Sequence, residues 1–486
     1  MDDSIILNQL VQHAKQEKIS FHVPGHKNGE IYKKYKNQYF SKDTLTKLLT
    51  LDVTEIPGTD NLYAPKEMIA EAQKRAARFY KADHSFFLVN GTSAGNISAL
   101  MTVANPNDKV IVPRDCHKSV MHGLIIGGFI PVYIQPEVSK EMNIPMGIKP
   151  ETVEQAILEN PDAKAVVLTY PNYYGICSDI EAIAKIVHKY EKVLVVDEAH
   201  GAHFNLSDRL PISAIEAGAD IVSQSTHKTL PAFTQSSMLH VKSKSIDVDR
   251  LRQMLMMHQS SSPSYLLMAS LDAARTVVEH DGSKWMNQLL KNIDDFYDAI
   301  SQTEGIGFIY EDIIGKYGVK NLDRTRLVIN MASLGISGTA LDQILSEKYH
   351  IQMEMSDMNH VVAVTTIGNS QKDFNRLLNA LQDIRKKERG TDKKITALPI
   401  AYAVPKVNII PRDAAFSKKT EVNFLCSENK ISGEYIIPYP PGIPLLCPGE
   451  EITAELIEYV NKLKVSGVNI IGMKDNELKR IKVIQK

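Results

Sequence analysis

The chain has 486 residues, with 56 Lys and Arg against 57 Asp and Glu and a formal net charge of −1. This balance removes the overall electrostatic reason to expect nucleic acid or an anionic membrane as a partner. A hydrophobic content of 43% with 23% charged residues is typical of a folded globular protein and excludes a disordered or fibrous chain. No apolar run reaches the roughly 18 to 20 residues that span a bilayer. Because Asp2 and Asp3 stand where a signal peptide carries positive charge, we expect a cytoplasmic protein.

Helical and strand-like segments alternate through the first half of the chain. Apolar residues at helical spacing over 68–79 precede an apolar run at 85–89 and a helical segment at 94–104. Short β-branched runs then occur at 110–112, 165–168, 193–196 and 220–222, with helical segments between them such as 180–190. Strands separated by helices imply right-handed crossovers and a mostly parallel sheet covered on both faces. The sequence therefore predicts the α/β fold class.

The chain is expected to have four parts. Residues 1–55 are predicted to form an N-terminal arm, 56–290 a large domain, 291–395 a smaller α+β domain and 396–486 a C-terminal domain. A charged linker is expected around 385–394, and an amphipathic helix over about 453–463.

Polar residues follow the predicted strands, where α/β proteins bind their ligands. The turn that contains Thr92, Ser93 and Ala94 offers backbone amides, two hydroxyls and a helix N-terminus, which suit a phosphate. Simple capping of the helix is the alternative. His117 follows the strand at 110–112, where an imidazole can stack on a flat cofactor or transfer a proton, the alternative being a structural histidine.

Two further strand ends carry candidate reactive groups. Asp197 ends the strand at 193–196, where a carboxylate can hold a proton on a heteroaromatic ring nitrogen. With Glu198, His200 and His203 it also makes a possible metal-ligand set, and spacing alone leaves both interpretations open. Lys228 can form a Schiff base if burial or neighbouring cations free its amine, the alternative being an exposed lysine. Together, a phosphate cradle, a stacking ring, a carboxylate and an amine nucleophile are what pyridoxal 5′-phosphate (PLP) requires.

Seven segments resemble the bacterial ornithine/lysine/arginine decarboxylases of the aspartate aminotransferase fold, PLP-dependent fold type I. They are, in the family's order between about residues 20 and 450, FHVPGHKNG, NGTSAGN, PRDCHKSVMHG, DEAHGAHF, STHKTLPAFTQSS, SSSPSYLLMASLDAAR and YPPGIPLLCPGE. The length resembles the short Gram-positive arginine and lysine decarboxylase branch, which lacks the N-terminal wing domain of the large acid-inducible enzymes. The resemblance implies that 56–290 binds PLP and that 396–486 is the family's C-terminal decarboxylase domain.

The resemblance also implies catalytic roles for four residues. Lys228 would bind PLP covalently, with His227 beside the Schiff base. Asp197 would pair with the pyridinium nitrogen, and His117 would stack on the ring. Lys228 or His227 would return a proton to the substrate's Cα.

Cofactor binding is implied for these residues and for others around them. Ala199 would pack on the second ring face. In this fold the active site lies at a dimer interface, so Ser260 would contact the phosphate from the partner subunit. Thr92, Ser93, Ala94 and Ser225 would bind the phosphate within the same subunit.

The implied reaction is decarboxylation of a basic amino acid, with arginine to agmatine first and lysine or ornithine next. Another fold type I reaction (transamination or elimination), a metal hydrolase and a non-catalytic relative are the alternatives. No metal cofactor is expected. Pro231 and Phe233 depart from the smaller or aliphatic residues common in relatives, which indicates a changed pocket wall. The acids that could bind the substrate's distal cation are Glu55, Asp60, Glu354, Asp357 and Glu450.

Overall fold

The computed structural model describes residues 4–16, 18–30, 32, 42–387, 405–438, 443–465 and 468–485. At its centre lies a seven-stranded sheet with the order β1-β10-β9-β8-β6-β2-β3. These strands are β1 (His84–Leu88), β2 (Lys109–Pro113), β3 (Ile130–Ile134), β6 (Ala165–Thr169), β8 (Val193–Asp197), β9 (Ile221–Gln224) and β10 (Ser237–Val241). The five strands from β9 to β3 are parallel, and β10 pairs antiparallel with both β9 and β1. The predicted mostly parallel sheet is confirmed.

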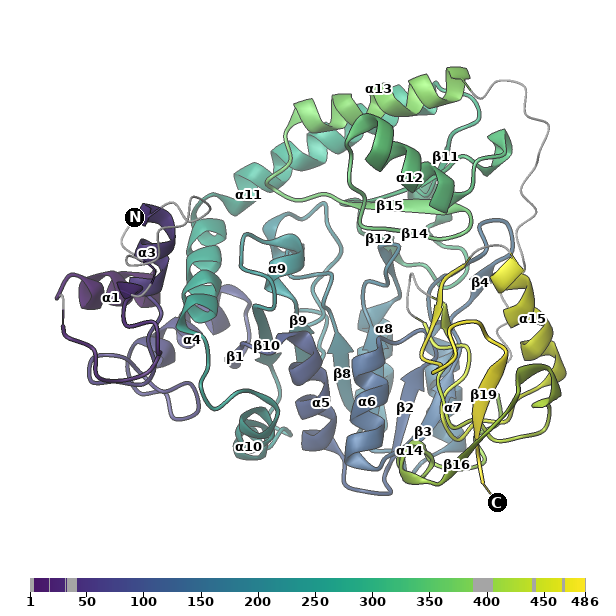
Figure 1. The fold of residues 1–486 in the computed structure, drawn as a ribbon, viewed down its shortest axis with the longest axis horizontal. Coiled ribbons are helices and arrows are strands. Elements are labelled where there is room, and N and C mark those ends of the chain that lie inside the picture. The colour runs from purple at the N-terminus through teal and green to yellow at the C-terminus, as the bar shows by residue number, and fades with distance from the viewer. Residues whose placement is uncertain are drawn as a thin grey trace.

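Helices cover both faces of this sheet (Figure 1). Along β6, Val166 and Leu168 face one core cluster, which includes α7, α8 and α11, whereas Val167 faces the cluster that includes α5, α6 and α10. Burial on both sides explains why the strands are continuous apolar runs. The helices are α4 (Met68–Phe79), α5 (Gly91–Val103), α6 (Lys118–Gly127), α7 (Pro150–Glu159), α8 (Ile180–Lys189), α9 (Thr226–Thr229), α10 (Val248–His258) and α11 (Tyr265–Ser301).

A second layer of structure lies at the far end of α11, at the top of Figure 1. Its four-stranded antiparallel sheet contains β11 (Gly307–Phe308), β13 (Arg326–Asn330), β15 (His360–Val364) and β14 (Met355–Ser356), with α12 (Gly338–Tyr349) and α13 (Gln371–Lys387). β12 (Asn321–Leu322) pairs with β7 (Ile176–Cys177) and so ties this part to the loops of the large sheet.

Two predicted boundaries, the domain boundary at 290/291 and the start of the linker at 385, fall inside helices. Residues 290 and 291 lie inside α11, so this helix runs through both of the parts that the boundary separates. The predicted linker starts at 385, but residues 385–387 complete the last turn of α13, which ends later than expected. Residues 388–394 of that linker lie outside the described residues.

The C-terminal part has its own apolar core. It contains α14 (Pro411–Phe416), β16 (Lys419–Asn423), β17 (Ile437–Pro438), α15 (Ala454–Val465), β18 (Ile470–Ile471) and β19 (Arg480–Ile484). The amphipathic helix expected at 453–463 is therefore confirmed as α15, whose Ile457 and Val460 are buried against Phe424 and Ile481. Residues 439–442, the start of the Pro-rich motif, lie outside the described residues.

A buried ion pair joins this C-terminal part to the large sheet. Arg114, directly after β2, binds both carboxylate oxygens of Glu450, with Nη2 at 2.8 Å from Oε2. Nη2 also donates to the carbonyl of Leu445 at 3.0 Å. Both charged side chains are at most 4% exposed. A buried charge without a partner is costly, so each of the two charges compensates the other.

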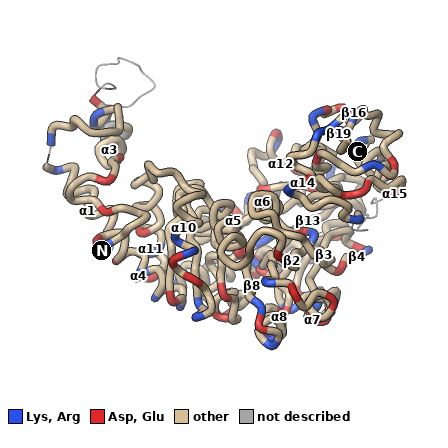
Figure 2. The backbone as a smooth tube through the Cα atoms, turned by 90° about the horizontal axis from the view of Figure 1, so that it is seen from below, with Lys and Arg blue, Asp and Glu red and all other residues tan. Residues whose placement is uncertain are grey.

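The N-terminal segment has a packed and an exposed portion. Helix α1 (Ile5–Ala14) buries Ile6 and Leu10 against α4 and α11, whereas Phe21 is 94% exposed. Helix α3 (Lys42–Thr50) lies at the end of the molecule beyond α1 (Figure 2). Figure 2 also shows basic and acidic positions mixed along the chain, in keeping with its balanced charge. Within the described ranges, no helix combines the length and apolar character needed to cross a membrane.

Short elements complete the described chain. The strands β4 (Val138–Ser139) and β5 (Ile144–Pro145) form a hairpin. The 3₁₀ helices are η1 (Phe204–Leu206), η2 (Glu311–Ile313), η3 (Ala332–Leu334) and η4 (Phe424–Cys426).

Candidate active site

Asp197 is the last residue of β8, at the carboxyl end of the parallel strands. Its side chain is buried, Oδ2 accepts a hydrogen bond from Asn96 Nδ2 at 2.8 Å, and Oδ1 accepts one from the amide of Ala199 at 3.1 Å. Of the described residues, none forms an ion pair with it within 4.0 Å, so its negative charge has only neutral donors as direct partners.

Close packing of α5 on the sheet brings Asn96 to this position. A Cβ at Gly95 would lie 2.9 Å from Ser223 Oγ on β9 and 2.8 Å from Leu88 Cδ1 on β1, so a larger residue would push the helix away. Asn96 also donates to Ser119 Oγ at 3.0 Å, which links α5 to α6. The orientation of the Asp197 carboxylate therefore depends on two helices.

Lys228 lies in the single-turn helix α9, directly after β9, the strand next to β8. Its Nζ is 3.0 Å from Nε2 of His200. Burial lowers the pKa of Lys228, the charge of Arg326 lowers it further, and the charges of Asp197 and Glu354 oppose this shift. Asp197 and Lys228 therefore stand at neighbouring strand ends, as predicted, and their charges interact, while burial favours a free amine.

Hydroxyl groups gather at the N-terminus of α5. Thr92 Oγ1 hydrogen-bonds Ser225 Oγ and donates to Ser237 Oγ at 3.1 Å. Thr92 and Ala94 are buried, whereas Ser93 is exposed in the first helical turn. Three segments thus bring hydroxyls to a 13-residue helix whose free amides attract an anion.

His117 is the N-cap residue of α6, and its Nδ1 accepts a hydrogen bond from the amide of Ser119 at 3.2 Å. Burial lowers the pKa of His117, while Asp197 raises it and Lys228 lowers it. His117 therefore interacts electrostatically with both Asp197 and Lys228. Ala199 is buried beside Asp197, to which its amide donates.

His227 and Ser260 have other partners in this structure. Nδ1 of His227 lies 2.9 Å from the carbonyl oxygen of Ser236, and the described hydrogen-bond partner of Lys228 Nζ is His200 instead. Ser260 is exposed, its carbonyl accepts from Tyr63 Oη, and its Oγ accepts from the amide of Ser262 at 3.2 Å. The predicted contact of Ser260 with a partner subunit's phosphate stays a prediction.

The four side chains of the alternative metal set point to separate partners. Glu198 Oε2 accepts from Gln224 Nε2 at 2.6 Å, and His203 Nε2 lies 3.2 Å from Asp323 Oδ1. His200 contacts Lys228 instead. In the part of the chain that the structure describes, no three His, Cys, Asp or Glu side chains are arranged to hold a metal ion. The described residues therefore do not provide geometry that supports the metal-hydrolase alternative.

Three of the five candidate substrate-binding acids are used by the fold. Asp60 accepts hydrogen bonds from the amides of Lys66, Glu67, Ile69 and Ala70 at the start of α4. Asp357 accepts from Tyr174 Oη at 2.7 Å and from two backbone amides, and Glu450 binds Arg114.

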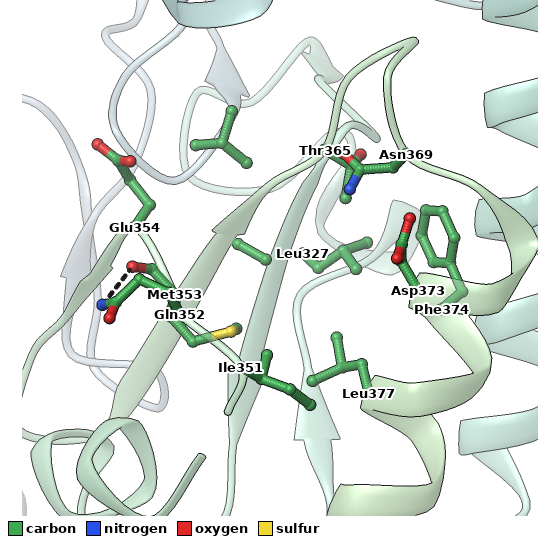
Figure 3. Close-up of a pocket in the computed structure, with 12 residues that line it drawn as sticks. Leu327, Ile351, Gln352, Met353, Glu354, Thr365, Asn369, Asp373, Phe374 and Leu377 are labelled. Atoms are coloured by element: carbon green, nitrogen blue, oxygen red, sulfur yellow. Dashed lines mark hydrogen bonds between the residues drawn. The ribbon is translucent and has the colours of Figure 1, made fainter. Parts of the chain in front are cut away.

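Glu354 is exposed and acts electrostatically on the site. Its charge raises the pKa of both Lys228 and Arg326 against the larger lowering effect of burial. Glu354 borders a pocket of about 280 Å³ between β13, β15 and α13. Figure 3 shows its carboxylate directed away from Leu377 and the apolar floor of this pocket. Glu55, which is partly exposed, is the other acid without an assigned structural role.

The sequence analysis assigned no role to three residues of the site, Asn96, Ser237 and Arg326, and considered His200 only as a possible metal ligand. Asn96 and His200 lie within the quoted motifs NGTSAGN and DEAHGAHF, so their positions carried a signal. Ser237 lies on β10 and Arg326 on β13, which meet the site only through the sheet order and the second layer of the fold.

The described residues fit PLP. A buried carboxylate and a partly buried lysine interact electrostatically without forming an ion pair, and hydroxyls gather at the N-terminus of α5. This donor set suits a protonated ring nitrogen, a carbonyl carbon and a phosphate, the three polar features of that cofactor.

Comparison with known proteins agrees with this site. The sequence profile of the Orn/Lys/Arg decarboxylase major domain matches residues 6–373, and that of its C-terminal domain matches residues 402–476. The arginine decarboxylase of Bacillus subtilis (strain 168) is 36% identical over 479 residues, which covers 98% of this chain and 96% of the relative. The arginine decarboxylase of Bacillus anthracis is 34% identical over 481 residues, with 99% and 97% covered.

Among solved structures, the Francisella novicida lysine decarboxylase LdcF shares the fold with a TM-score of 0.85 at 21% identity. The alignment covers 99% of this chain and 81% of LdcF. The predicted fold class is therefore confirmed. From the matching profiles and the identity along nearly its whole length, this chain belongs to the Orn/Lys/Arg decarboxylase family.

Proposed function

We propose that this protein is a PLP-dependent carbon–carbon lyase that converts L-arginine to agmatine and carbon dioxide. The observation that carries the proposal is that the buried Asp197 and the partly buried Lys228 stand at neighbouring strand ends without forming an ion pair with each other. Arginine is the first choice because the two Bacillus relatives with this name match almost end to end. Lysine and ornithine are the alternatives, because a carboxylate such as Glu354 can pair with an ammonium or a guanidinium group.

The cofactor-binding residues have separate tasks. Lys228 would bind PLP covalently. Thr92, Ser93 and Ser225, next to Ala94, would bind its phosphate at the start of α5, where backbone amides also point outward. His117 and Ala199 would pack against the ring. When bound, PLP supplies the conjugated ring that accepts the electron pair left by departing carbon dioxide.

Asp197 controls the protonation of the ring nitrogen. A buried carboxylate favours a proton on a neighbouring base, because burial strengthens the attraction between the two charges. Asn96 and the amide of Ala199 hold both carboxylate oxygens, so the carboxylate can keep one orientation. Lys228, or His227 beside it, would return a proton to the substrate's Cα.

We assign Glu354 to the cationic end of the substrate. Three of the five candidate acids already accept several hydrogen bonds from the fold, whereas Glu354 is exposed and electrostatically coupled to Lys228. A guanidinium would gain two parallel hydrogen bonds from such a carboxylate. The exposed Phe233, five residues after Lys228, would form part of the pocket wall.

Further features of the proposal concern the assembly and the cell. We propose a homodimer in which Ser260 of one subunit completes the phosphate site of the other, in a cytoplasmic enzyme that supplies amine for polyamine synthesis. The division into an arm (1–55), a large PLP-binding domain (56–290), a small domain (291–395) and a C-terminal domain (396–486) belongs to the same proposal.

Borohydride reduction tests the cofactor part of this proposal. The protein is loaded with PLP, reduced and digested, and its peptides are analysed by mass spectrometry. We expect the mass of the reduced cofactor on Lys228 and its loss in Lys228→Ala. Attachment at another lysine, or no attachment at any lysine, would contradict the proposal.

A further inference from the structure

Lys228, His200 and Arg326 form a continuous chain of polar contacts. Nζ of Lys228 lies 3.0 Å from Nε2 of His200. On the other side of the ring, Nη2 of Arg326 lies 2.9 Å from Nδ1. His200 and Arg326 are buried, at 8% and 1% exposure, so water competes little for these contacts.

The contact from Arg326 determines which ring nitrogen of His200 carries the proton. A guanidinium has only N–H donors and stays charged, so Nδ1 of His200 must accept. A neutral imidazole has a single N–H, which therefore lies on Nε2. This N–H points at Nζ of Lys228. Nζ must then accept, and an ammonium group has no lone pair with which to do so.

Several features keep His200 neutral and in place. Burial holds the pKa of His200 well below its ordinary value, and a positive charge on Lys228 or on Arg326 lowers it further. The ring of Tyr173 packs edge-on against His200, with centroids 5.3 Å apart. Gly175 has a φ of +83°, and a Cβ there would lie 2.9 Å from Cγ of Arg326, so this glycine leaves room for the arginine.

We propose that Arg326 is a positioning residue that fixes His200 in its Nε2–H tautomer, and that His200 thereby holds the amine of Lys228 in its neutral form. The inference deepens the proposed function and rests on it for its purpose, because the neutral amine is the nucleophile. His200 would be ready to donate to Nζ whenever Lys228 is released from the cofactor.

The other charged groups around Lys228 act in both directions. Asp197 on β8 and Glu354 before β14 favour the ammonium form, whereas Arg326 on β13 favours the neutral amine. A positive charge on Lys228 also lowers the pKa of His117, which lies at the start of α6. The hydrogen bond from His200 therefore favours the neutral amine together with burial and Arg326, whereas Asp197 and Glu354 favour the ammonium form.

The protonation of Lys228 can be measured without substrate. Cofactor-free protein, shown to be folded by circular dichroism, is trace-labelled with acetic anhydride across a pH series, and the peptides that contain Lys228 and the exposed Lys244 are quantified. We expect the labelling midpoint of Lys228 to lie at least about one pH unit below that of Lys244, a tenfold difference in free amine at intermediate pH. A midpoint at or above that of Lys244 would overturn the proposal, whether or not any variant folds.

A double-mutant cycle isolates the tautomer from the charge of Arg326. In Arg326→Met the charge is lost and the ring is free to turn its acceptor nitrogen to Lys228, so the midpoint should rise through both effects. In the His200→Phe background the same substitution removes only the charge and should raise the midpoint less. Equal shifts in the two backgrounds would overturn the role of the tautomer.

A second measurement reads the tautomer directly. In ¹⁵N-histidine-labelled cofactor-free protein, with His200→Gln identifying the resonances, Nδ1 should have the shift of an unprotonated and Nε2 that of a protonated ring nitrogen. The reverse assignment would contradict the proposal. None of these measurements requires decarboxylation, so failure here is distinguishable from failure of the proposed function.

Discussion

Asn96 donates a hydrogen bond to Asp197 over 2.8 Å and so joins the second turn of α5 to the end of β8. The contact depends on Gly95, which lets the helix approach Ser223 on the neighbouring strand. We predict that Asn96→Ala lowers kcat by about 10- to 100-fold, the usual effect of losing a residue that orients a catalytic group. Steady-state kinetics checks this, with Ser98→Ala as control because Ser98 lies on the same helix but contacts His258. Wild-type kcat in Asn96→Ala would contradict the orienting role.

Asp197→Ala should keep the fold and lose most of the activity. The carboxylate is the group that we expect to hold the proton on the ring nitrogen, and loss of a comparable electrostatic contribution costs about 10²- to 10³-fold in kcat. Circular dichroism verifies the fold and carbon dioxide release measures the activity. Turnover near that of the wild type would overturn the assigned role.

Glu354→Gln should weaken substrate binding more than catalysis. A hydrogen bond to a charged group contributes about 1.5–3 kcal/mol, so KM for the basic amino acid should rise by about 10- to 100-fold with a smaller change in kcat. Asp373→Asn is the matched control, because Asp373 lines the same pocket but binds Ser370. The assignment fails if both variants keep the wild-type KM.

Glu450→Gln should destabilise the contact between the C-terminal part and the large sheet. It leaves Arg114 buried without its counter-charge, which costs about 3–5 kcal/mol. Thermal and urea unfolding measure the loss. The exposed pair of Glu421 and Lys474 provides the control, since Glu421→Gln should change stability little. Similar unfolding curves for the two variants would contradict a structural role for Arg114–Glu450.

His240 should make stability depend on pH in mildly acidic solution. Burial lowers the pKa of His240 to about 3, whereas an unfolded histidine titrates near 6.5. Between these values the unfolded chain binds one more proton than the folded protein. This contribution is therefore complete above about pH 6.5 and falls by up to about 1.4 kcal/mol per pH unit as the pH drops.

Comparison of His240→Gln with the wild type isolates this contribution from those of other buried histidines. Nδ1 of His240 contacts Ser85 Oγ and Nε2 contacts Gln224 Oε1, so the neutral ring is well satisfied and the variant should be less stable at pH 7. The difference in unfolding free energy should narrow between pH 6.5 and 5. Parallel pH curves would show that His240 does not carry this effect.

The sequence predicted the central sheet because its strands are buried on both faces. Continuous apolar runs such as VLVV before Asp197 identify such strands without any tertiary information. Strand β10 was missed, since its sequence SMLHV contains Ser237 and His240, whose polar groups are satisfied only by β1, β9 and α5. Strand β3 was missed likewise, because Pro131 is the second residue of IPVYI and proline is disfavoured inside strands.

The site was predictable where function lies at a strand end and less so where it depends on packing. Asp197 directly follows one apolar run and Lys228 comes six residues after another, so their position at neighbouring strand ends could be expected from the rule for parallel sheets. Arg326 is distant in sequence and reaches His200 only because the second layer of the fold lies over the carboxyl ends of the large sheet. Its charge and burial have no local sequence signal.

The central claim is decarboxylation of a basic amino acid by a PLP-dependent site built on Lys228. Carbon dioxide release from arginine, lysine and ornithine, each labelled in the carboxyl carbon, tests it most directly in protein loaded with PLP. We predict labelled carbon dioxide, fastest from arginine, and none above background from Lys228→Ala. Absence of release from all three amino acids, or undiminished release by Lys228→Ala, would contradict the claim.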